Sequence, residues 1–268
     1  MGVETVWIPA AEPFDGESLL GFLGARAVEG LEEVTGGSYR RSVSLNNGAG
    51  AVSVRPEASG VQVKLDLADP GDADEALARV GRLFALDADP APVVEVLGSD
   101  ALLGPLVRAR PGLRVPGAFD GFELAVRAVV GQQVSVAGAR TVLGRLVREH
   151  GAFDAQALSE ADPFAFPFPG ARGAALVEVA RLVAGGELRL DPDTDAAETR
   201  ARLLAVPGIG PWTVSYIAMR ALADRDVFLD GDVGVRRALA ALGGDADADR
   251  WRPWRSYAVM HLWRSLGG

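Results

Sequence analysis

The chain has 268 residues, 49% of them hydrophobic, which is enough for one large domain or two to three small ones around a hydrophobic core. It has no cysteine and only two histidines, which excludes disulfides, a thiol nucleophile, a cysteine-ligated zinc or iron–sulfur site and a histidine-rich metal centre. The net charge of -9 argues against a nucleic-acid partner for the chain as a whole, because phosphate binding depends on Lys and Arg.

The N-terminal residues 1–88 predict an α+β domain. Hydrophobic and polar residues alternate over 51–54 and 61–65, and turn sequences at 46–48 and 59–60 separate these runs, which is typical of antiparallel strands. Apolar residues recur with helical spacing over 17–31 and 72–86.

The residues from 89 onward predict helices and no comparable strand. Pro90 and Pro92 mark the expected boundary within 87–98. Helical patterns follow: two within 119–151 that meet near Gly131, one over 170–186, and one over 193–206. The chain contains no apolar run of about 18 residues and starts with no signal-peptide pattern, so we expect a cytoplasmic protein without a membrane partner.

A tight turn, "VPGIGPW", follows the last of these helical patterns. Pro207 ends the helix, Gly208 and Gly210 permit backbone angles closed to other residues, and Pro211 suits the first position of the next helix. Backbone N–H groups at such a helix start form an anion site, and phosphate is the anion we expect there. Taken alone, the pattern favours an ordinary corner between two helices, in which the glycines relieve steric crowding.

The segment 250–264, "RWRPWRSYAVMHLWR", combines four Arg, three Trp and one Tyr without an acidic residue. A basic, aromatic surface of this kind suits nucleic acid, and Arg252 and Arg255 are its candidate phosphate contacts. The simpler interpretation is a solvated helix face whose Trp residues anchor the core.

The turn "VPGIGPW" resembles the hairpin of the helix-hairpin-helix DNA glycosylase superfamily, and Asp232 lies 22 positions after Gly210, where that superfamily has its catalytic aspartate. The segments "LLGFLGARAVEG", "FELAVRAVVGQQVSVAGAR", "DVFLDGD" and "RWRPWRSYAVMHLW" resemble the DNA-3-methyladenine glycosylase II (AlkA) branch, in the same order. The resemblance implies an α+β fold: an N-terminal antiparallel-sheet domain, then an all-α core. In that core, 89–118 with 223–268 would form one subdomain and 119–222 the other, with the hairpin at 203–217.

The resemblance implies a monofunctional DNA glycosylase of base-excision repair, acting on alkylated purines such as 3-methyladenine and 7-methylguanine. Bifunctional relatives resemble one another in having a Schiff-base Lys two residues after the last hairpin glycine, where this chain has Trp212. The only Lys is Lys64, in a predicted strand. We therefore expect no lyase activity, double-stranded DNA with alkylated bases as the partner, a monomer near the nucleoid and no required cofactor.

The resemblance also implies roles for individual residues. Asp232 would be the catalytic carboxylate, although it is equally well placed to cap the helix that follows. Gln133 would be the wedge that fills the gap left by the flipped base, at a position where the best-known relatives have an apolar residue. The base pocket would contain Trp212, Tyr216, Trp263 and Phe22; the phosphate contacts would be Gly208, Ile209, Gly210 and Thr213; and the carbonyls of Leu204, Val206 and Ile209 match positions that hold a structural monovalent cation in related hairpins.

Three alternatives stay open. Each aromatic residue of the predicted pocket also suits core packing. A non-catalytic helix-hairpin-helix module that recognises damaged or bent DNA would need the hairpin but neither Asp232 nor the aromatic residues. The chain also suits one part of a longer alkylation-response polypeptide.

Val233 and Gly234 follow the catalytic position, where bulkier side chains are possible, so we expect a widened pocket.

Overall fold

The computed structural model describes residues 4–244 and 247–267. The chain packs as two compact units. Unit 1 comprises Met1–Ala27, Glu32–Gly117 and Arg225–Gly268, and unit 2 comprises Val28–Leu31 and Ala118–Asp224. The boundary predicted near residue 88 lies inside unit 1, so a separation of 1–88 from the later parts of that unit remains a prediction.

Unit 1 contains an antiparallel sheet, in which the described strands have the order β1-β5-β4-β3-β2. The hairpins form where the turn sequences predict them, between β3 and β4 and between β4 and β5. Alternate residues such as Val52, Val54 and Val63 are buried, so one face of the sheet carries the core. The strands are β1 (Glu4–Pro9), β2 (Glu32–Thr35), β3 (Ser38–Ser44), β4 (Ala49–Glu57) and β5 (Gly60–Leu67).

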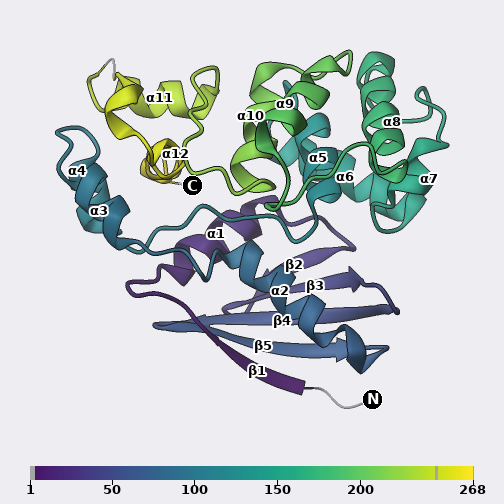
Figure 1. Ribbon diagram of the computed structural model, residues 1–268, viewed down its shortest axis with the longest axis horizontal. Coiled ribbons are helices and arrows are strands. Elements are labelled where there is room, and N and C mark those ends of the chain that lie inside the picture. Colours follow the sequence, from purple (N-terminus) through teal and green to yellow (C-terminus); the bar gives the residue numbers. More distant parts are fainter. Residues whose placement is uncertain (1–3, 245–246, 268) are drawn as a thin grey trace. The chain divides into compact units, whose positions relative to one another are not determined.

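Two helices, α1 (Gly16–Arg26) and α2 (Ala73–Phe84), cover this sheet (Figure 1). The ring of Tyr39 on β3 meets Phe84 of α2 edge to face, with ring centroids 6.1 Å apart. Asp15 starts α1 by accepting a hydrogen bond from the Ser18 amide. The remaining helical elements of unit 1 are η1 (Pro70–Asp72), α3 (Ala91–Gly98), α4 (Gly104–Ala109), α11 (Val233–Ala241), η2 (Ala248–Trp251) and α12 (Arg255–Ser265).

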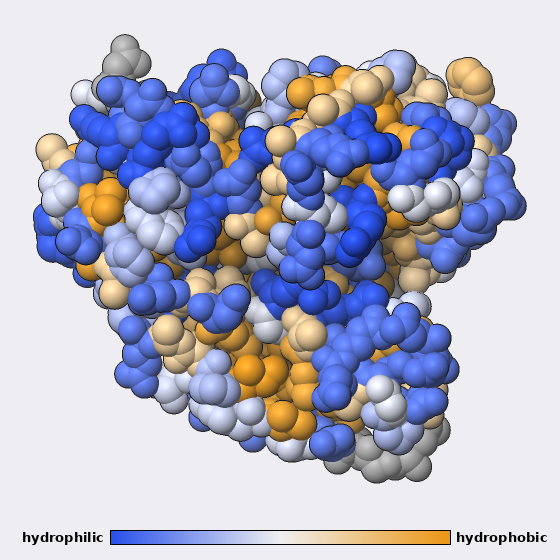
Figure 2. Space-filling model, in the orientation of Figure 1, coloured by the Kyte–Doolittle hydropathy of each residue, from blue (hydrophilic) through white to orange (hydrophobic). Residues whose placement is uncertain are grey.

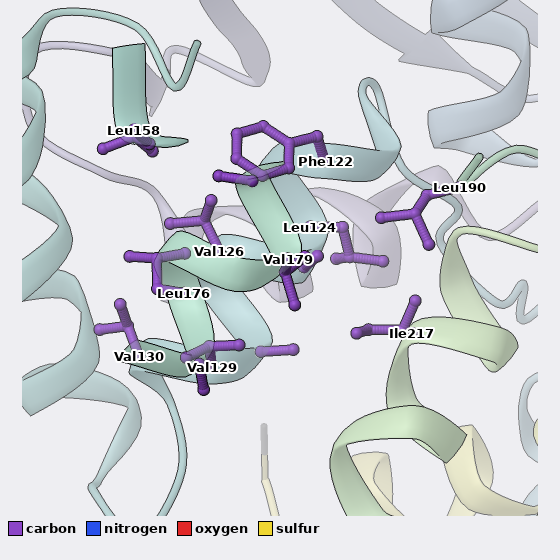
Figure 3. Packing of buried hydrophobic residues seen from close by; sticks show 14 of the residues in the cluster. Phe122, Leu124, Val126, Val129, Val130, Leu158, Leu176, Val179, Leu190 and Ile217 are labelled. Carbon is purple, nitrogen blue, oxygen red and sulfur yellow. The ribbon is translucent and has the colours of Figure 1, made fainter. Parts of the chain in front are cut away.

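The described residues of unit 2 form helices joined by loops, without a strand, and the unit has its own core. Figure 3 shows this core, in which Phe122, Val126 and Val129 of α5 lie close to Leu176 and Val179 of α8. Apolar residues cover most of α5, which explains why this helix is central. The helices are α5 (Gly121–Val130), α6 (Val136–His150), α7 (Ala155–Ser159), α8 (Gly170–Ala184), α9 (Ala196–Ala205) and α10 (Pro211–Arg220).

The predicted α+β class is confirmed, and the two helices expected to meet near Gly131 are α5 and α6. Sequence patterns missed the short strands β1 and β2, and the segment predicted as a boundary contains α3, because Pro92 is accommodated in the first turn of that helix. Among the described residues, no helix is long and apolar enough to cross a membrane.

Candidate active site

Asp232 occupies the N-cap position of α11. Its Oδ1 accepts a hydrogen bond from the Val235 amide at 2.9 Å. The same oxygen accepts a second hydrogen bond, also at 2.9 Å, from Nε1 of Trp263 on α12. The carboxylate is half-buried, so it remains accessible to solvent. The capping interpretation is therefore correct, and the bond from Trp263 is a feature that capping alone does not require.

Two aromatic rings, Phe22 of α1 and Trp263 of α12, form an aromatic wall that contacts Asp232 through Trp263, and Arg26 of α1 packs on it. The rings of Phe22 and Trp263 stack, with centroids 6.3 Å apart and an interplanar angle of 23°. The guanidinium carbon of Arg26 lies 3.7 Å from the centroid of the Phe22 ring and 6.0 Å from that of Trp263. Arg26 was not predicted from the sequence, although its position four residues after Phe22 on one helix could have identified it.

Gly234 allows Trp263 to approach Asp232 closely. A Cβ atom at position 234 would lie 3.0 Å from both Asp232 Oδ1 and Trp263 Cδ1. The neighbouring Val233 side chain is exposed. The volume that a side chain at position 234 would fill is occupied by the Trp263 indole, so the widened pocket expected at Val233 and Gly234 remains a prediction.

A buried polar cluster joins the two helices that carry the aromatic wall. Ser18 Oγ donates to Asp15 at 2.6 Å and accepts from Arg110 and from Arg264, which follows Trp263 on α12. Burial raises the pKa of the Asp15 carboxyl, but the hydrogen bonds from Ser18 and Arg110 outweigh this effect and leave the pKa below its ordinary value. Burial lowers the pKa of His261, also on α12, to about 4. These contacts hold α1 and α12 at a defined spacing.

The hairpin of unit 2 connects α9 to α10. Val206 and Ile209 are buried in the core of unit 2, while Pro207 and Gly208 are exposed. Gly208 has φ +91°, which favours glycine, and a Cβ there would also crowd Ala175 of α8 at 3.2 Å. The apolar residues therefore anchor the turn and leave its glycine backbone at the surface.

The start of α10 has the form expected of an anion site. Gly210 is the N-cap and contributes no side-chain hydrogen bond, and Pro211 occupies the first turn. Thr213 is only 2% exposed, and its hydroxyl accepts a hydrogen bond from Gln132 at 2.9 Å. The hydroxyl therefore bonds inside unit 2, and its contact with a phosphate remains a prediction.

Trp212 and Tyr216 form a second aromatic pair on α10. Their rings stack at 5.3 Å with an interplanar angle of 11°, and the Tyr216 hydroxyl accepts a hydrogen bond from the buried Arg220 at 2.9 Å. This pair belongs to unit 2, whereas Phe22, Trp263 and Asp232 belong to unit 1. The structure thus brings the predicted pocket residues together in two groups, and a pocket that combines both groups remains a prediction.

The two arginines predicted to contact phosphate form ion pairs within unit 1. Arg255 binds Asp226 through Nε at 2.7 Å, and Arg252 binds both Asp226 at 2.5 Å and Asp249 at 3.0 Å. The surface over α11 in Figure 2 is largely hydrophilic, and this helix carries two exposed arginines, Arg236 and Arg237, which sequence analysis did not select.

The carbonyls predicted to hold a monovalent cation lie at the end of α9 and in the hairpin. The Val206 carbonyl accepts a hydrogen bond from the Ile209 amide at 3.0 Å. A carbonyl oxygen has two lone pairs, so this bond leaves capacity for a cation. No group of three or more His, Cys, Asp or Glu side chains that could hold a metal ion occurs among the described residues.

Comparisons with known proteins show the family of this chain. Residues 5–120 match the family model of the AlkA N-terminal domain. The chain is 35% identical to DNA-3-methyladenine glycosylase 2 of Escherichia coli, over 97% of this chain and 96% of that protein. This chain belongs to the DNA-3-methyladenine glycosylase 2 (AlkA) family. The predicted resemblance is therefore confirmed.

Two further proteins are similar to this chain, one in sequence and one in fold. The chain is 42% identical to the probable bifunctional transcriptional activator/DNA repair enzyme AlkA of Mycobacterium tuberculosis, over 99% of this chain but only 58% of that protein's length. The solved structure of the 3-methyladenine DNA glycosylase from Archaeoglobus fulgidus has the same fold, with a TM-score of 0.81, 20% identity, and coverage of 96% of this chain and 97% of that one.

Proposed function

We propose that this chain is a monofunctional DNA glycosylase that removes alkylated purines from double-stranded DNA in base-excision repair. The observation that carries this proposal is the Asp232 carboxylate, which is bonded to both the start of α11 and the indole of Trp263, next to the stacked rings of Phe22 and Trp263. Membership of the DNA-3-methyladenine glycosylase 2 family supports the choice of substrate.

The proposed reaction needs one carboxylate. A purine alkylated at N3 or N7 carries a positive charge and is already a good leaving group, so cleavage of the N-glycosidic bond requires little general-acid help. The sugar then develops oxocarbenium character, and a preorganised anion stabilises it. Asp232 supplies this anion, and because Val235 and Trp263 both bond Oδ1, the carboxylate has a fixed orientation.

The aromatic residues give the proposed preference for charged bases. The face of an electron-rich ring attracts a cationic purine by about 1–2 kcal/mol more than a neutral one. Trp263 is half-buried beside Asp232, and Trp212 with Tyr216 offers a second stacked surface. In the proposed complex the flipped base meets an aromatic face, because the glycosidic bond is inaccessible while the base is stacked in the duplex.

The hairpin is the proposed binding site for the DNA backbone. We call its predicted phosphate contacts, Gly208, Ile209, Gly210 and Thr213, the phosphate grip. The amides of Gly208 and Gly210 would bind phosphates next to the lesion, with Gln133 filling the gap in the base stack. The predicted Ile209 amide donates to the Val206 carbonyl and would have to exchange this bond for one to phosphate. A monovalent cation on the carbonyls of Leu204, Val206 and Ile209 would bridge to the same phosphate. The chain spans 58% of the length of its Mycobacterium tuberculosis relative, and the proposal concerns the repair reaction.

The absence of lyase activity is part of the proposal. Trp212 occupies the position of the expected Schiff-base lysine, and Lys64, the only Lys of the chain, is on strand β5 of unit 1. An imine with the sugar therefore has no suitable amine. The test is release of free base from methylated duplex DNA, followed by alkali to cleave the abasic sites. Strand cleavage without alkali, or a covalent adduct trapped by borohydride, would contradict the monofunctional assignment.

A further inference from the structure

The side-chain amide of Gln132 connects the loop between α5 and α6 to the hairpin and to the start of α10. Gln132 follows the end of α5, and its Nε2 donates to the Gly208 carbonyl at 3.1 Å and to the Thr213 hydroxyl at 2.9 Å. A side-chain amide has two N–H groups, so each can serve one of these acceptors. One acceptor lies in the hairpin and the other in the first turn of α10. Gln132 therefore bonds both parts of the proposed phosphate grip.

The next residue is held in an unfavourable backbone conformation. Gln133 has φ +58°, in the left-handed region that non-glycine residues seldom occupy, and its side chain is exposed. Ser135 then caps α6 by accepting the Gly138 amide at 3.1 Å. Gln133 is thus flanked by Gln132, bonded to the hairpin, and by Ser135, bonded to α6. Such a conformation persists when its surroundings determine it from both sides.

We propose that Gln132 is a positioning residue, which locks the turn carrying Gln133 to the hairpin so that the wedge and the phosphate grip act as one rigid element. This inference rests on the proposed function. A wedge stabilises a flipped base only if it enters the stack at a fixed distance from the phosphates that the protein holds. If Gln132 no longer bonded Gly208 and Thr213, the turn and the hairpin could move independently. The geometry in which the wedge and the phosphate contacts engage the DNA together would then form less often.

The proposed role of Gln132 predicts different effects on a fully paired duplex and on a duplex that lacks the partner base. In a fully paired duplex the enzyme must extrude the base, so loss of the lock should slow excision. When the partner base is missing, extrusion is easier and the wedge contributes less. A merely structural role for Gln132 would affect both substrates equally.

The experiment uses Gln132→Glu, which keeps the length of the side chain but removes both N–H donors. Single-turnover excision of 7-methylguanine is measured opposite cytosine and opposite an abasic-site analogue. We expect the paired rate to fall about 10- to 100-fold and the unpaired rate to change less than about threefold. Gln156→Glu on α7, where the amide bonds Glu160, is the matched control and should keep the wild-type ratio of the two rates.

The Thr213 hydroxyl allows a second, independent test. Thr213→Val removes one acceptor, whereas Thr213→Ser retains it, so the serine variant should have the higher paired-to-unpaired ratio of the two. Combining Thr213→Val with Gln132→Glu should cost less than the product of the two single effects, because both changes break the same bond. Hydrogen exchange of the backbone amides in 206–214, other than Pro207 and Pro211, which have none, should accelerate in Gln132→Glu when measured without DNA.

The outcomes separate this inference from the proposed function. An unchanged ratio of the paired to the unpaired rate in Gln132→Glu, which means equal losses on both substrates, would overturn the positioning role. Unchanged hydrogen exchange in this variant would also overturn it. If the wild-type protein released no base from either substrate, the proposed function would fail, and the exchange measurement would still decide whether Gln132 holds the hairpin.

Discussion

At the scale of single residues, Asp232 has two roles that a conservative substitution can separate. An asparagine side chain can still accept from Val235 and Trp263, and it caps helices about as well as aspartate, so Asp232→Asn should leave the unfolding free energy nearly unchanged. Base release should fall by orders of magnitude, because a lost preorganised electrostatic contact raises the barrier by roughly 3–4 kcal/mol. Single-turnover kinetics and DNA affinity, measured on the same sample, check this prediction.

Asp230 provides the matched control for Asp232. It is exposed, and its carboxylate accepts a hydrogen bond from the Gly231 amide at 2.8 Å. Asp230→Asn should therefore have a mild effect on base release. We would abandon the assignment of Asp232 if Asp232→Asn released bases at a near wild-type rate, or if the change at Asp230 were the more damaging. No base release from the wild-type protein, with DNA binding retained, would favour a module that only binds damaged DNA.

His261 predicts how stability depends on pH. Its pKa in the folded protein is about 4, because burial disfavours the charged imidazolium, against 6.5 in the unfolded chain. The unfolded state therefore binds a proton first as the pH falls, and the folded state loses stability between about pH 6.5 and 4. The loss approaches about 3 kcal/mol at the acid end of this range.

Urea unfolding at several pH values tests the His261 prediction. His261→Gln removes the imidazole, so its unfolding free energy should fall less steeply than that of the wild type between pH 6.5 and 4. The exposed His150 on α6 gives the control, and His150→Gln should keep the wild-type slope. Parallel curves for wild type and His261→Gln would show that this prediction is wrong.

At the scale of elements, the packing of α11 against α12 sets the position of the indole of Trp263. Gly234→Ala places a methyl group about 3.0 Å from both Asp232 Oδ1 and Trp263 Cδ1, so the indole must shift. We expect base release to fall on the order of tenfold. Stability should change by less than about 1 kcal/mol, because alanine favours the helix. Gly231→Ala meets nothing within 4 Å and should retain wild-type base release.

At the scale of the whole molecule, a net charge of -9 repels DNA, so binding must depend on local cations. The exposed Arg236 and Arg237 of α11 are candidates for these contacts. Changing both to Gln should weaken binding to all duplexes alike and reduce the slope of log affinity against log salt by about 1.8, without loss of stability. Fluorescence anisotropy at several salt concentrations measures this slope.

Replacing both Arg252 and Arg255 should differ in its effect on stability from replacing Arg236 and Arg237. We expect the replacement of Arg252 and Arg255 to weaken DNA binding as well, but also to lower the unfolding free energy, since Asp226 would lose both partners. A double variant with unchanged affinity would remove these two residues from the DNA-binding surface and leave them a structural role alone. Thermal unfolding of both double variants separates the two cases.

The sequence by itself determined the features that depend on residues close together in the chain. Pro207, Gly208 and Pro211 specify the hairpin, because their backbone preferences act locally. Asp232 is identifiable as a helix cap for the same reason, and Trp212 stacks on Tyr216 because positions four apart share a helix face. The order of the matching motifs along the chain indicated the family and the α+β class.

Only the tertiary structure decided which distant side chains meet. The bond from Trp263 to Asp232 spans 31 residues, and that from Gln132 to Gly208 spans 76. Hydrophobic periodicity shows which face of a helix is buried, but not which residue of another helix that face contacts. Long-range packing therefore assigned Arg26 to the aromatic wall, placed Arg252 and Arg255 with Asp226, and revealed the bond from Gln132 to the hairpin carbonyl of Gly208.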